Sequence, residues 1–409
     1  MSIHTPTRLG PAEEALAAQL DGGANPQAAA RFRDVGLPTR RVEAYHYTDL
    51  KSLIRAVPDL ASPAITASQS AVNLPGSYRL MIANGRVSEG AGVAPAGVIF
   101  RKVDGPVLGE RDDAIVRLNA ALAREALRLD LDGSVDPLIH IDHRIEGDAA
   151  HVVDGAVINV ADNASAIVVE TFSGSNKAHM GNHAAYVSLG RNARLTHVQI
   201  DLGGAEATHF ASTEYDIAEG AHLRTLVVHA GSALARSQAF ARFAGPGAHA
   251  DFGGLNLASG NQHLDMTLSI EHAVPGTTSE ERIKQVARDG ARSVFQGKIV
   301  VARDAQKTDA RMMSQGLMLS ERAEIFSKPE LEIFADDVQC GHGSTCGEID
   351  DESLFYLMSR GIPRGEAEGM LVRAFLAELV DGIDNEYLQQ AINDIIDRWL
   401  GAGAASVAA

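Results

Sequence analysis

Both cysteines of the chain and one histidine lie within seven residues of each other. In the segment Cys340-Gly-His342-Gly-Ser-Thr-Cys346, two potential iron ligands, Cys340 and His342, are separated by a single residue. On an extended strand, residues i and i+2 point to the same side, so this thiol and imidazole could hold one metal ion or cluster together. The alternative is a buried cysteine and a hydrogen-bonded histidine at the end of a strand, because free cysteines are often core residues.

The number of ligands limits what this segment can do alone. Two thiols and one imidazole cannot close an iron–sulfur cluster site, which normally takes four protein ligands. Iron bound at Cys340 and His342 therefore requires further ligands from a second chain. Cys346 stands six residues after Cys340, which does not fit C-x-x-C metal spacing, and we interpret it as a packing residue.

Other catalytic patterns are absent or misplaced. The chain has no G-x-x-x-x-G-K-[ST] phosphate loop and no G-x-S-x-G nucleophile elbow. Gly245-Pro-Gly-Ala-His-Ala250 matches a dinucleotide-binding pattern, but it precedes a predicted strand and is typical of a turn. His179 and His183 have the spacing of zinc ligands on a helix, yet Gly181 and the β-rich surroundings predict an exposed loop instead.

Composition indicates a globular protein with an acidic surface. With 409 residues, 45% of them hydrophobic, the chain can bury a core and hold two or three structural units. The 36 basic and 53 acidic residues give a net charge of −17, which argues against nucleic acid or anionic membrane as a partner. Two cysteines form no disulfide framework, the N-terminus lacks a basic start followed by an apolar run, and no apolar segment is long enough to cross a membrane. We therefore expect a cytoplasmic protein.

The pattern divides the chain into three regions: a mixed, partly helical region at 1–135, a β region at 136–347 and a helical region at 348–409. Within the first region, 11–35 predicts two helices separated by Gly22-Gly23, and 80–87 predicts a strand that enters the Asn84-Gly85 turn. A helical pattern then extends from Ala114 to Leu127.

The β region contains a weak repeat of about 28 residues. Small residues recur at turns just before predicted strands, with intervals of 29, 28 and 27 residues between Ala164, Ala193, Ala221 and Ala248. Such a period in strand-only units favours a solenoid, whose turns bury an apolar stripe against one another. A β-sandwich is the alternative, because its strands also recur at short intervals.

Two amphipathic helices are predicted in the third region. The apolar face of the first is assigned to Met370, Leu371, Ala374, Phe375 and Leu379, and that of the second to Leu388, Ile392, Ile395, Ile396 and Trp399. Because two helices cannot bury these residues alone, they must pack on the solenoid or on another protein.

Several segments resemble one family. The run from Lys328 to Cys346, the helix-forming run from Ile349 to Ile362, and the segments 36–41 and 43–48 (GLPTRR and EAYHYT) are similar to motifs of the SufB/SufD family of iron–sulfur cluster assembly proteins. The resemblance extends from Gly36 to Leu379 and implies a right-handed parallel β-helix core flanked by N-terminal and C-terminal helical regions.

Single positions indicate which of the two types in this family, SufB or SufD, the chain resembles. Ser314 stands where the scaffold type, SufB, is expected to carry a cluster-ligating cysteine. The Cys340-x-His342 segment and the shorter chain resemble the SufD type. In that type the equivalent of His342 faces a cysteine of the partner across a heterodimer interface.

The resemblance also implies partners and cofactors. A SufD-like chain pairs with a SufB-type scaffold and with SufC-type ABC ATPases, supports cluster assembly and iron acquisition, and is not itself an enzyme, in agreement with the missing phosphate loop. A nascent iron–sulfur cluster would be shared transiently with the SufB-type partner at His342 and Cys340. Reduced flavin is associated with such complexes, although the chain has no flavin motif, and a homodimer is an alternative state of the isolated chain.

The resemblance places the ATPase contact on the C-terminal helices and the scaffold contact on the last strands of the β-helix, which would pair edge to edge with the partner. The residues expected at the ATPase interface are Phe355, Tyr356, Ser359, Arg360, Gly361, Phe375 and Leu379.

Two other functions compete with this assignment. A β-helical carbohydrate-active enzyme would need paired carboxylates in a groove lined by aromatic platforms, but aromatic residues make up only 5% of the chain. A purely structural subunit of the complex would use the same fold without any ligand role for His342.

Overall fold

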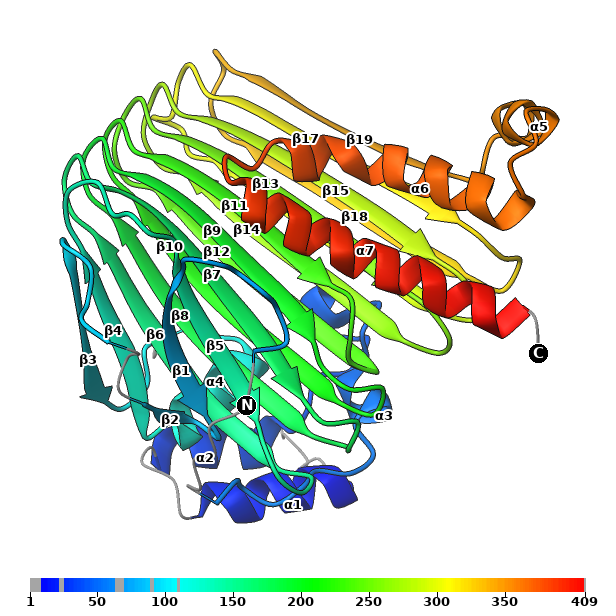
Figure 1. Cartoon of the computed structure of the whole chain (residues 1–409). Helices are drawn as coiled ribbons and strands as arrows, with labels where there is room; N and C mark the ends of the chain where they lie inside the picture. The colour runs from blue at the N-terminus through cyan, green and yellow to red at the C-terminus, as the bar shows by residue number, and fades with distance from the viewer. Residues whose placement is uncertain (1–8, 22–25, 63–69, 89–91, 109–110, 408–409) are drawn as a thin grey trace.

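A computed structural model describes residues 9–21, 26–62, 70–88, 92–108 and 111–407 of the chain. Its core is a parallel β-solenoid built from two sheets that face each other, with helices at both ends of the chain (Figure 1). The predicted fold class, mainly β with a parallel β-helix between helical regions, is confirmed.

From β4 onward the chain alternates between the two sheets, so each strand pairs with the strand two places later. The ten-stranded sheet contains, in spatial order, β19 (Gln339–Gly347), β17 (Asp309–Met318), β15 (Thr278–Ala287), β13 (His249–Ala258), β11 (His222–His229), β9 (Arg194–Leu202), β7 (Ser165–Gly174), β5 (Ile139–Ile145), β1 (Tyr78–Ala83) and β2 (Arg86–Val87). The nine-stranded sheet contains β18 (Glu324–Ile333), β16 (Arg292–Val301), β14 (His263–His272), β12 (Leu234–Phe243), β10 (Thr208–Ile217), β8 (Met180–Leu189), β6 (His151–Val160), β4 (Glu125–Leu131) and β3 (Val98–Asp104).

The repeat alanines mark the corners of the solenoid. Ala164, Ala193, Ala221 and Ala248 are all buried, and each directly precedes a strand of the ten-stranded sheet. A small side chain is needed there because successive turns stack closely at each corner. The Gly245-to-Ala250 segment is one of these corners, as predicted.

The sheets begin earlier in the chain than residue 136. Strand β1 pairs in parallel with β5, and β4 pairs in parallel with β6, while β2 and β3 add antiparallel strands at this end. The predicted turn at Asn84-Gly85 connects β1 to β2. The helix expected to continue to Leu127 ends at Leu122, because the chain turns after Ala123 into β4, where Leu127 packs inside the solenoid.

Helices cover the outer faces of both sheets. The nine-stranded sheet is covered by α1 (Pro11–Leu20), α2 (Pro26–Val35), the short turns η1 (Glu43–Tyr45) and α3 (Leu50–Leu53), and α4 (Ala114–Leu122). The ten-stranded sheet is covered by α6 (Arg364–Asp381) and α7 (Glu386–Val407), with α5 (Asp351–Ser359) projecting beyond it (Figure 1). The C-terminal pair therefore packs on the solenoid, one of the two outcomes expected.

The second predicted helical face is confirmed and the first is wrong. On α7, the predicted apolar residues from Leu388 to Trp399 are all buried. On α6, the buried residues are Ala367, Gly369, Val372, Leu376 and Val380, whereas Met370 and Ala374 are exposed. Apolar residues lie on more than one side of this helix, so periodicity alone could not choose the face that meets the sheet.

The interior of the solenoid is apolar along one side and polar along the other. Inward residues alternate along each strand, and the first inward positions are aliphatic, as at Ile139 and Ile141 of β5 or Val168 of β7. The next inward positions on the same strands are charged or polar, as at His143 and Glu170, and these are also buried. Buried polar groups must be hydrogen-bonded to be tolerated, so this side contains stacked networks.

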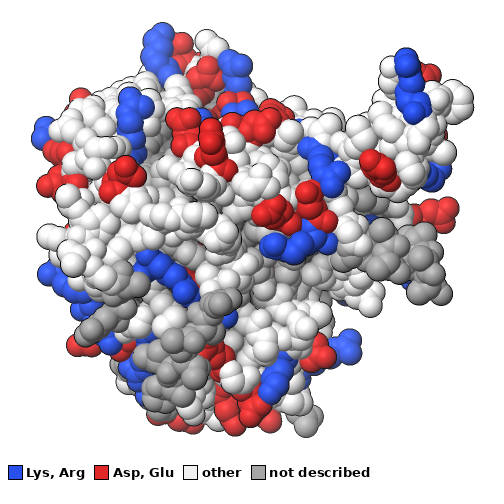
Figure 2. Space-filling model, in the orientation of Figure 1, with Lys and Arg blue, Asp and Glu red and all other residues white. Residues whose placement is uncertain are grey.

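No helix of the described residues is long and apolar enough to cross a membrane. Figure 2 shows lysine, arginine, aspartate and glutamate side chains scattered over one face, without a broad basic surface. This distribution agrees with the net charge of −17.

The 43–48 segment is fastened to the nine-stranded sheet by a buried ion pair. Arg236 on β12 and Asp265 on β14 form a salt bridge with no exposed side-chain area. The Arg236 guanidinium also donates to the Ala44 carbonyl at 2.8 Å and lies 4.2 Å from the centre of the Tyr45 ring. Thr48 donates to Asp265 at 2.5 Å. These contacts explain the presence of Tyr45 and Thr48 in this segment, because both side chains contact the buried ion pair.

We expect Asp265→Ala to destabilise the fold by about 3–5 kcal/mol, because it leaves the Arg236 charge buried without its partner. Urea unfolding followed by circular dichroism measures the change. The matched control is Glu271→Ala, which removes the exposed partner of Arg242 and should leave the unfolding midpoint unchanged. Equal effects in both variants would contradict this account of the ion pair.

Candidate functional site

Cys340 and His342 lie on the last strand of the solenoid. Strand β19 pairs with β17 so that Cys340 is opposite Ala310 and His342 is opposite Met312. Ala310 and Met312 are buried inward residues, so Cys340 and His342 continue the inward row by one further turn. They therefore point to the same side of the strand, at the end of the solenoid where no later turn of the described chain follows.

The two side chains line one surface pocket of about 520 Å³. Cys340 is half-buried and packs against the core, whereas His342 is exposed. The histidine is thus not the buried residue of the alternative interpretation. Burial raises the pKa of the Cys340 thiol, and the nearby Asp309 and Glu281 charges act in the same direction. A raised pKa keeps this thiol protonated at neutral pH until a metal ion or a partner's charge displaces the proton.

A buried carboxyl lies behind this pocket. Glu281 on β15 is opposite Met312, so it occupies the same inward row two turns before His342, and it also lines the pocket. The residue is fully buried, and neither of its carboxyl oxygens has a hydrogen-bond partner among the described residues. Burial raises the pKa of Glu281 to about 8. No local pattern in the sequence points to Glu281, because its place in this row depends on strand register.

Cys346 and Ser314 take different positions. Cys346 is exposed on β19, four residues beyond His342, and is not a packing residue of the core. Ser314 is fully buried on β17, where its hydroxyl lies 2.8 Å from that of Ser327 and accepts a hydrogen bond from Gln285 at 3.1 Å. The position expected for the scaffold type's cysteine is therefore part of a polar network within the solenoid.

The residues predicted for the ATPase interface fall into two groups. Those on and just after α5 are exposed, with Phe355 73% and Tyr356 56% accessible, and Ser359, Arg360 and Gly361 are exposed beside them. Exposed aromatic side chains on a projecting helix are typical of a binding surface.

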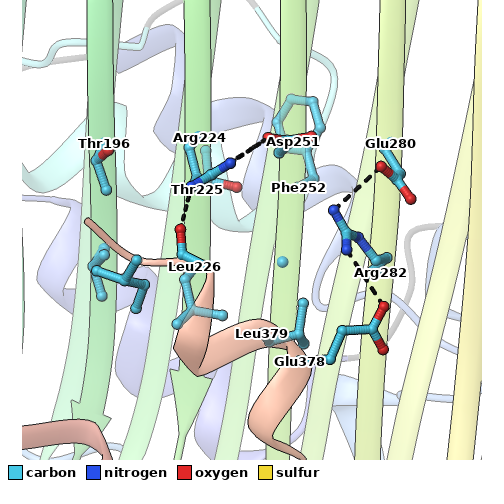
Figure 3. Close-up of a pocket in the computed structure, with 14 residues that line it drawn as sticks. Thr196, Arg224, Thr225, Leu226, Asp251, Phe252, Glu280, Arg282, Glu378 and Leu379 are labelled. Atoms are coloured by element: carbon cyan, nitrogen blue, oxygen red, sulfur yellow. Dashed lines mark hydrogen bonds and ion pairs between the residues drawn. The ribbon is translucent and has the colours of Figure 1, made fainter. Parts of the chain in front are cut away.

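Phe375 and Leu379 on α6 are half-buried against the ten-stranded sheet. The ammonium group of Lys284 lies 4.7 Å from the centre of the Phe375 ring. Figure 3 shows Leu379 pointing toward the sheet, in a pocket bordered by Glu378 and Arg282, whose side chains are 3.4 Å apart. At about 60 Å³ this pocket is too small for an organic ligand. Phe375 and Leu379 mainly fix α6 to the solenoid.

The prediction of an exposed loop around His179 and His183 is wrong. Both histidines are buried, and His183 lies on strand β8 with its side chain inside the solenoid. The Nδ1 atom of His183 is 2.6 Å from Asp154 on β6, and Asp154 is 3.4 Å from His143 on β5. Sequence reasoning missed this group because Gly181 was taken as a loop residue, although a glycine also fits where a strand backbone passes close to a large side chain.

Comparison with known proteins agrees with this architecture. The family model described as "SUF system FeS cluster assembly, SufBD core domain" matches residues 143–375. The chain is 30% identical over 383 residues to the iron–sulfur cluster assembly protein SufD of Escherichia coli, covering 90% of both chains. It is 28% identical over 388 residues to a SufBD family protein of Mycobacterium tuberculosis, covering 89% of both.

A parallel solenoid with helices on both outer faces and an open end carrying Cys340 and His342 defines the class of protein. The chain belongs to the SufB/SufD family of SUF-system iron–sulfur cluster assembly proteins. Within that family it is of the SufD type.

The raised pKa of Glu281 predicts a pH-dependent stability. Between about pH 4.5 and 8 the folded chain holds one more proton than the unfolded chain, so this residue's contribution is complete at low pH and is lost as the pH rises. The loss should be at most about 1.4 kcal/mol for each pH unit. Glu281→Gln should remove this contribution, so in urea titrations from pH 5 to 8 the free energy of unfolding of the wild type should fall relative to that of the variant as the pH rises.

Glu280→Gln is the matched control for this measurement. Glu280 is the preceding residue on β15 and points outward to Arg282; its charge adds to a pKa shift of Glu281 that burial mainly causes, so its substitution should leave most of the pH dependence in place. An identical slope in the wild type and in Glu281→Gln would show that this carboxyl is not held neutral.

Proposed function

We propose that this chain is the SufD-like subunit of a SUF complex, where it pairs with a SufB-type scaffold and binds SufC-type ATPases to support cluster assembly and iron acquisition in the cytoplasm. The open end of the solenoid supports this proposal most directly. A long exposed strand edge invites pairing with another chain, and natural monomers usually cover such edges.

The two ends of the solenoid differ. At the first end, the antiparallel strands β2 and β3 and the N-terminal helices lie beside the sheets. At the other end, β18 and β19 are the terminal strands of both sheets, and most of their residues are partly or fully exposed. A scaffold of the same fold would extend both sheets across this end, and a second copy of this chain would occupy the same edges in the absence of the scaffold.

The proposed cluster site lies at that interface. His342 would supply an imidazole and Cys340 a thiolate, and the scaffold chain would supply the remaining ligands that an iron–sulfur cluster requires. The exposed His342 suits a site shared by two chains, because a ligand buried in one chain could not reach a cluster held by the other. The cluster is cargo of the complex, held transiently. Reduced flavin would be bound elsewhere in the complex.

The ATPase would bind the surface around α5. The chain has no phosphate loop, so ATP hydrolysis must come from another subunit. Phe355 and Tyr356 offer an aromatic anchor on a helix that projects from the body of the molecule (Figure 1). Movement of the docked ATPases would be transmitted through α5 and α6 to the sheet that ends in β19.

We expect His342→Ala to lower the iron and sulfide content of the co-purified complex at least about tenfold while leaving the complex assembled, because a ligand is lost without creating a cavity. Cys340→Ala should have a milder effect, since its half-buried thiol is nearly replaced in volume by alanine. Metal analysis and native mass spectrometry measure the two properties separately.

Thr345→Ala is the control for a general disturbance of β19, because Thr345 is exposed on the same strand outside the pocket. Unchanged cluster content in His342→Ala would instead support a purely structural subunit. A complete loss of clusters in Cys340→Ala alone would reverse the ranking of the two ligands.

A charge at Phe355 should disrupt ATPase binding without unfolding the chain. Phe355→Asp would bury an unpaired carboxylate in the complex, so the affinity should fall by about 2 kcal/mol or more, roughly 30-fold in Kd. The melting temperature should stay the same because this side chain is 73% exposed. Isothermal titration with the ATPase subunit measures the affinity.

Tyr387→Asp is the matched control, since Tyr387 is a similarly exposed aromatic residue, 60% accessible, at the start of α7 and away from α5. Equal loss of binding in both variants would mean that α5 is not the docking site. A wild-type chain that never binds the ATPase would contradict the proposed function as a whole.

A further inference from the structure

A histidine–aspartate–histidine group lies inside the solenoid, far along the chain from Cys340 and His342. His143 on β5, Asp154 on β6 and His183 on β8 each place one potential ligand atom within 4.8 Å of the other two. All three residues are at most 5% exposed. Asp154 and His183 are opposite each other on paired strands, and His143 reaches them from the other sheet.

One imidazole nitrogen of this group makes no hydrogen bond among the described residues. The Nε2 atom of His143 lies 2.9 Å from Glu170 on the neighbouring β7, two residues before Phe172, which is opposite His143. Its Nδ1 atom faces Asp154 at 3.4 Å and makes no hydrogen bond within the described part of the chain. An imidazole whose second nitrogen is held by a carboxylate is the usual arrangement of a metal-binding histidine, because that contact fixes the ring and strengthens the ligand.

The buried carboxylates of the group need positive charge beside them, and each contacts two imidazoles: Asp154 those of His143 and His183, Glu170 those of His143 and His197. Asp154 and Glu170 are two carboxylates inside the solenoid, where an uncompensated charge is costly. One divalent ion bound to neutral imidazoles would balance both of them. The 3.4 Å between the His143 Nδ1 atom and Asp154 is close to the roughly 3.3 Å that separates ligands about 2 Å from a tetrahedral ion, whereas the 2.6 Å between His183 and Asp154 is a hydrogen bond that would lengthen on binding.

The space next to the group fits one additional small ligand. A cavity of about 20 Å³ is lined by His143, His183 and His209, which is enough for one water molecule. Gly181 keeps this space open, since a Cβ atom there would come within 2.7 Å of the His183 Nε2 atom. The Phe172 ring packs on both imidazoles, with its centre 4.5 and 4.6 Å from theirs.

We propose that His143, Asp154 and His183 bind one divalent transition-metal ion, with water as a fourth ligand and Glu170 orienting His143. Imidazole and carboxylate ligands suit zinc, iron(II) and related ions rather than calcium or magnesium. The ion would connect the two sheets across the polar side of the solenoid, close to where it begins.

The test uses the full chain with Cys340, His342 and Cys346 all replaced by alanine. This background is free of cysteine and lacks the proposed cluster ligands, so the result is independent of the proposed function. After treatment with a chelator, the protein is loaded with Zn²⁺ or Co²⁺ and dialysed, and bound metal is counted by mass spectrometry. We expect one equivalent, a higher melting temperature, and a Co²⁺ absorption spectrum of nitrogen and oxygen ligands.

Single variants in this background identify the ligands. Asp154→Asn and His183→Asn should weaken binding at least about 100-fold, and Glu170→Gln should weaken it about 10–100-fold. His140→Asn is the matched control. His140 lies on β5 with His143 and is as deeply buried, but it hydrogen-bonds to Thr171 at 2.8 Å, outside the metal-binding group. This variant should retain the metal.

Two outcomes would overturn the proposal. One is a background chain that binds no ion after loading, which would mean that protons alone balance the two carboxylates. The other is full metal binding in both Asp154→Asn and His183→Asn. If a ligand variant does not fold, the background chain alone still tests whether the ion is bound inside. An ion bound at the surface would show the Co²⁺ spectrum of the hydrated ion and would leave the melting temperature unchanged.

Discussion

The in-register stacking of parallel strands is the constraint on which the rest of the structure depends. Each inward residue lies directly beside the residue one turn earlier and one turn later, as Asp154 lies beside His183. A polar residue placed inside must therefore find its partner in the neighbouring turns. The hydrogen bond from His229 to Asn256 at 2.9 Å follows this rule, and Asn256 then donates across the interior to Ser293 of the facing sheet at 3.0 Å.

The same stacking explains why one end of the molecule is suited to a partner. A turn inside the solenoid is covered on both sides, so Glu281 and Met312 are buried. The last turn has a neighbouring turn on one side only. Its inward residues, Cys340 and His342, are therefore half-buried and exposed, respectively. Residues of one repeating pattern thus become core or binding surface according to whether another turn follows.

The sequence predicted those features that depend on local spacing. The corner alanines recur at nearly constant intervals, so the solenoid and its turns were predictable, and strand alternation predicts that Cys340 and His342 point to the same side of their strand. The group around Asp154 was not predictable, because its members are brought together by register and by the approach of two sheets. Likewise, nothing local indicates that Phe375 packs on the sheet while Phe355 projects into solvent.

The two candidate metal sites differ in a way that follows from their depth. A site inside the solenoid must obtain all its ligands from one chain, and an ion there would exchange slowly because the surrounding strands would have to separate. Under the proposed function, a site at the open end would lack ligands until a partner arrives, and it would become accessible again when the interface moves. A resident structural ion therefore suits the group at Asp154, whereas transient cargo suits His342. The fold can hold both because they lie in different turns and in different inward rows of the solenoid.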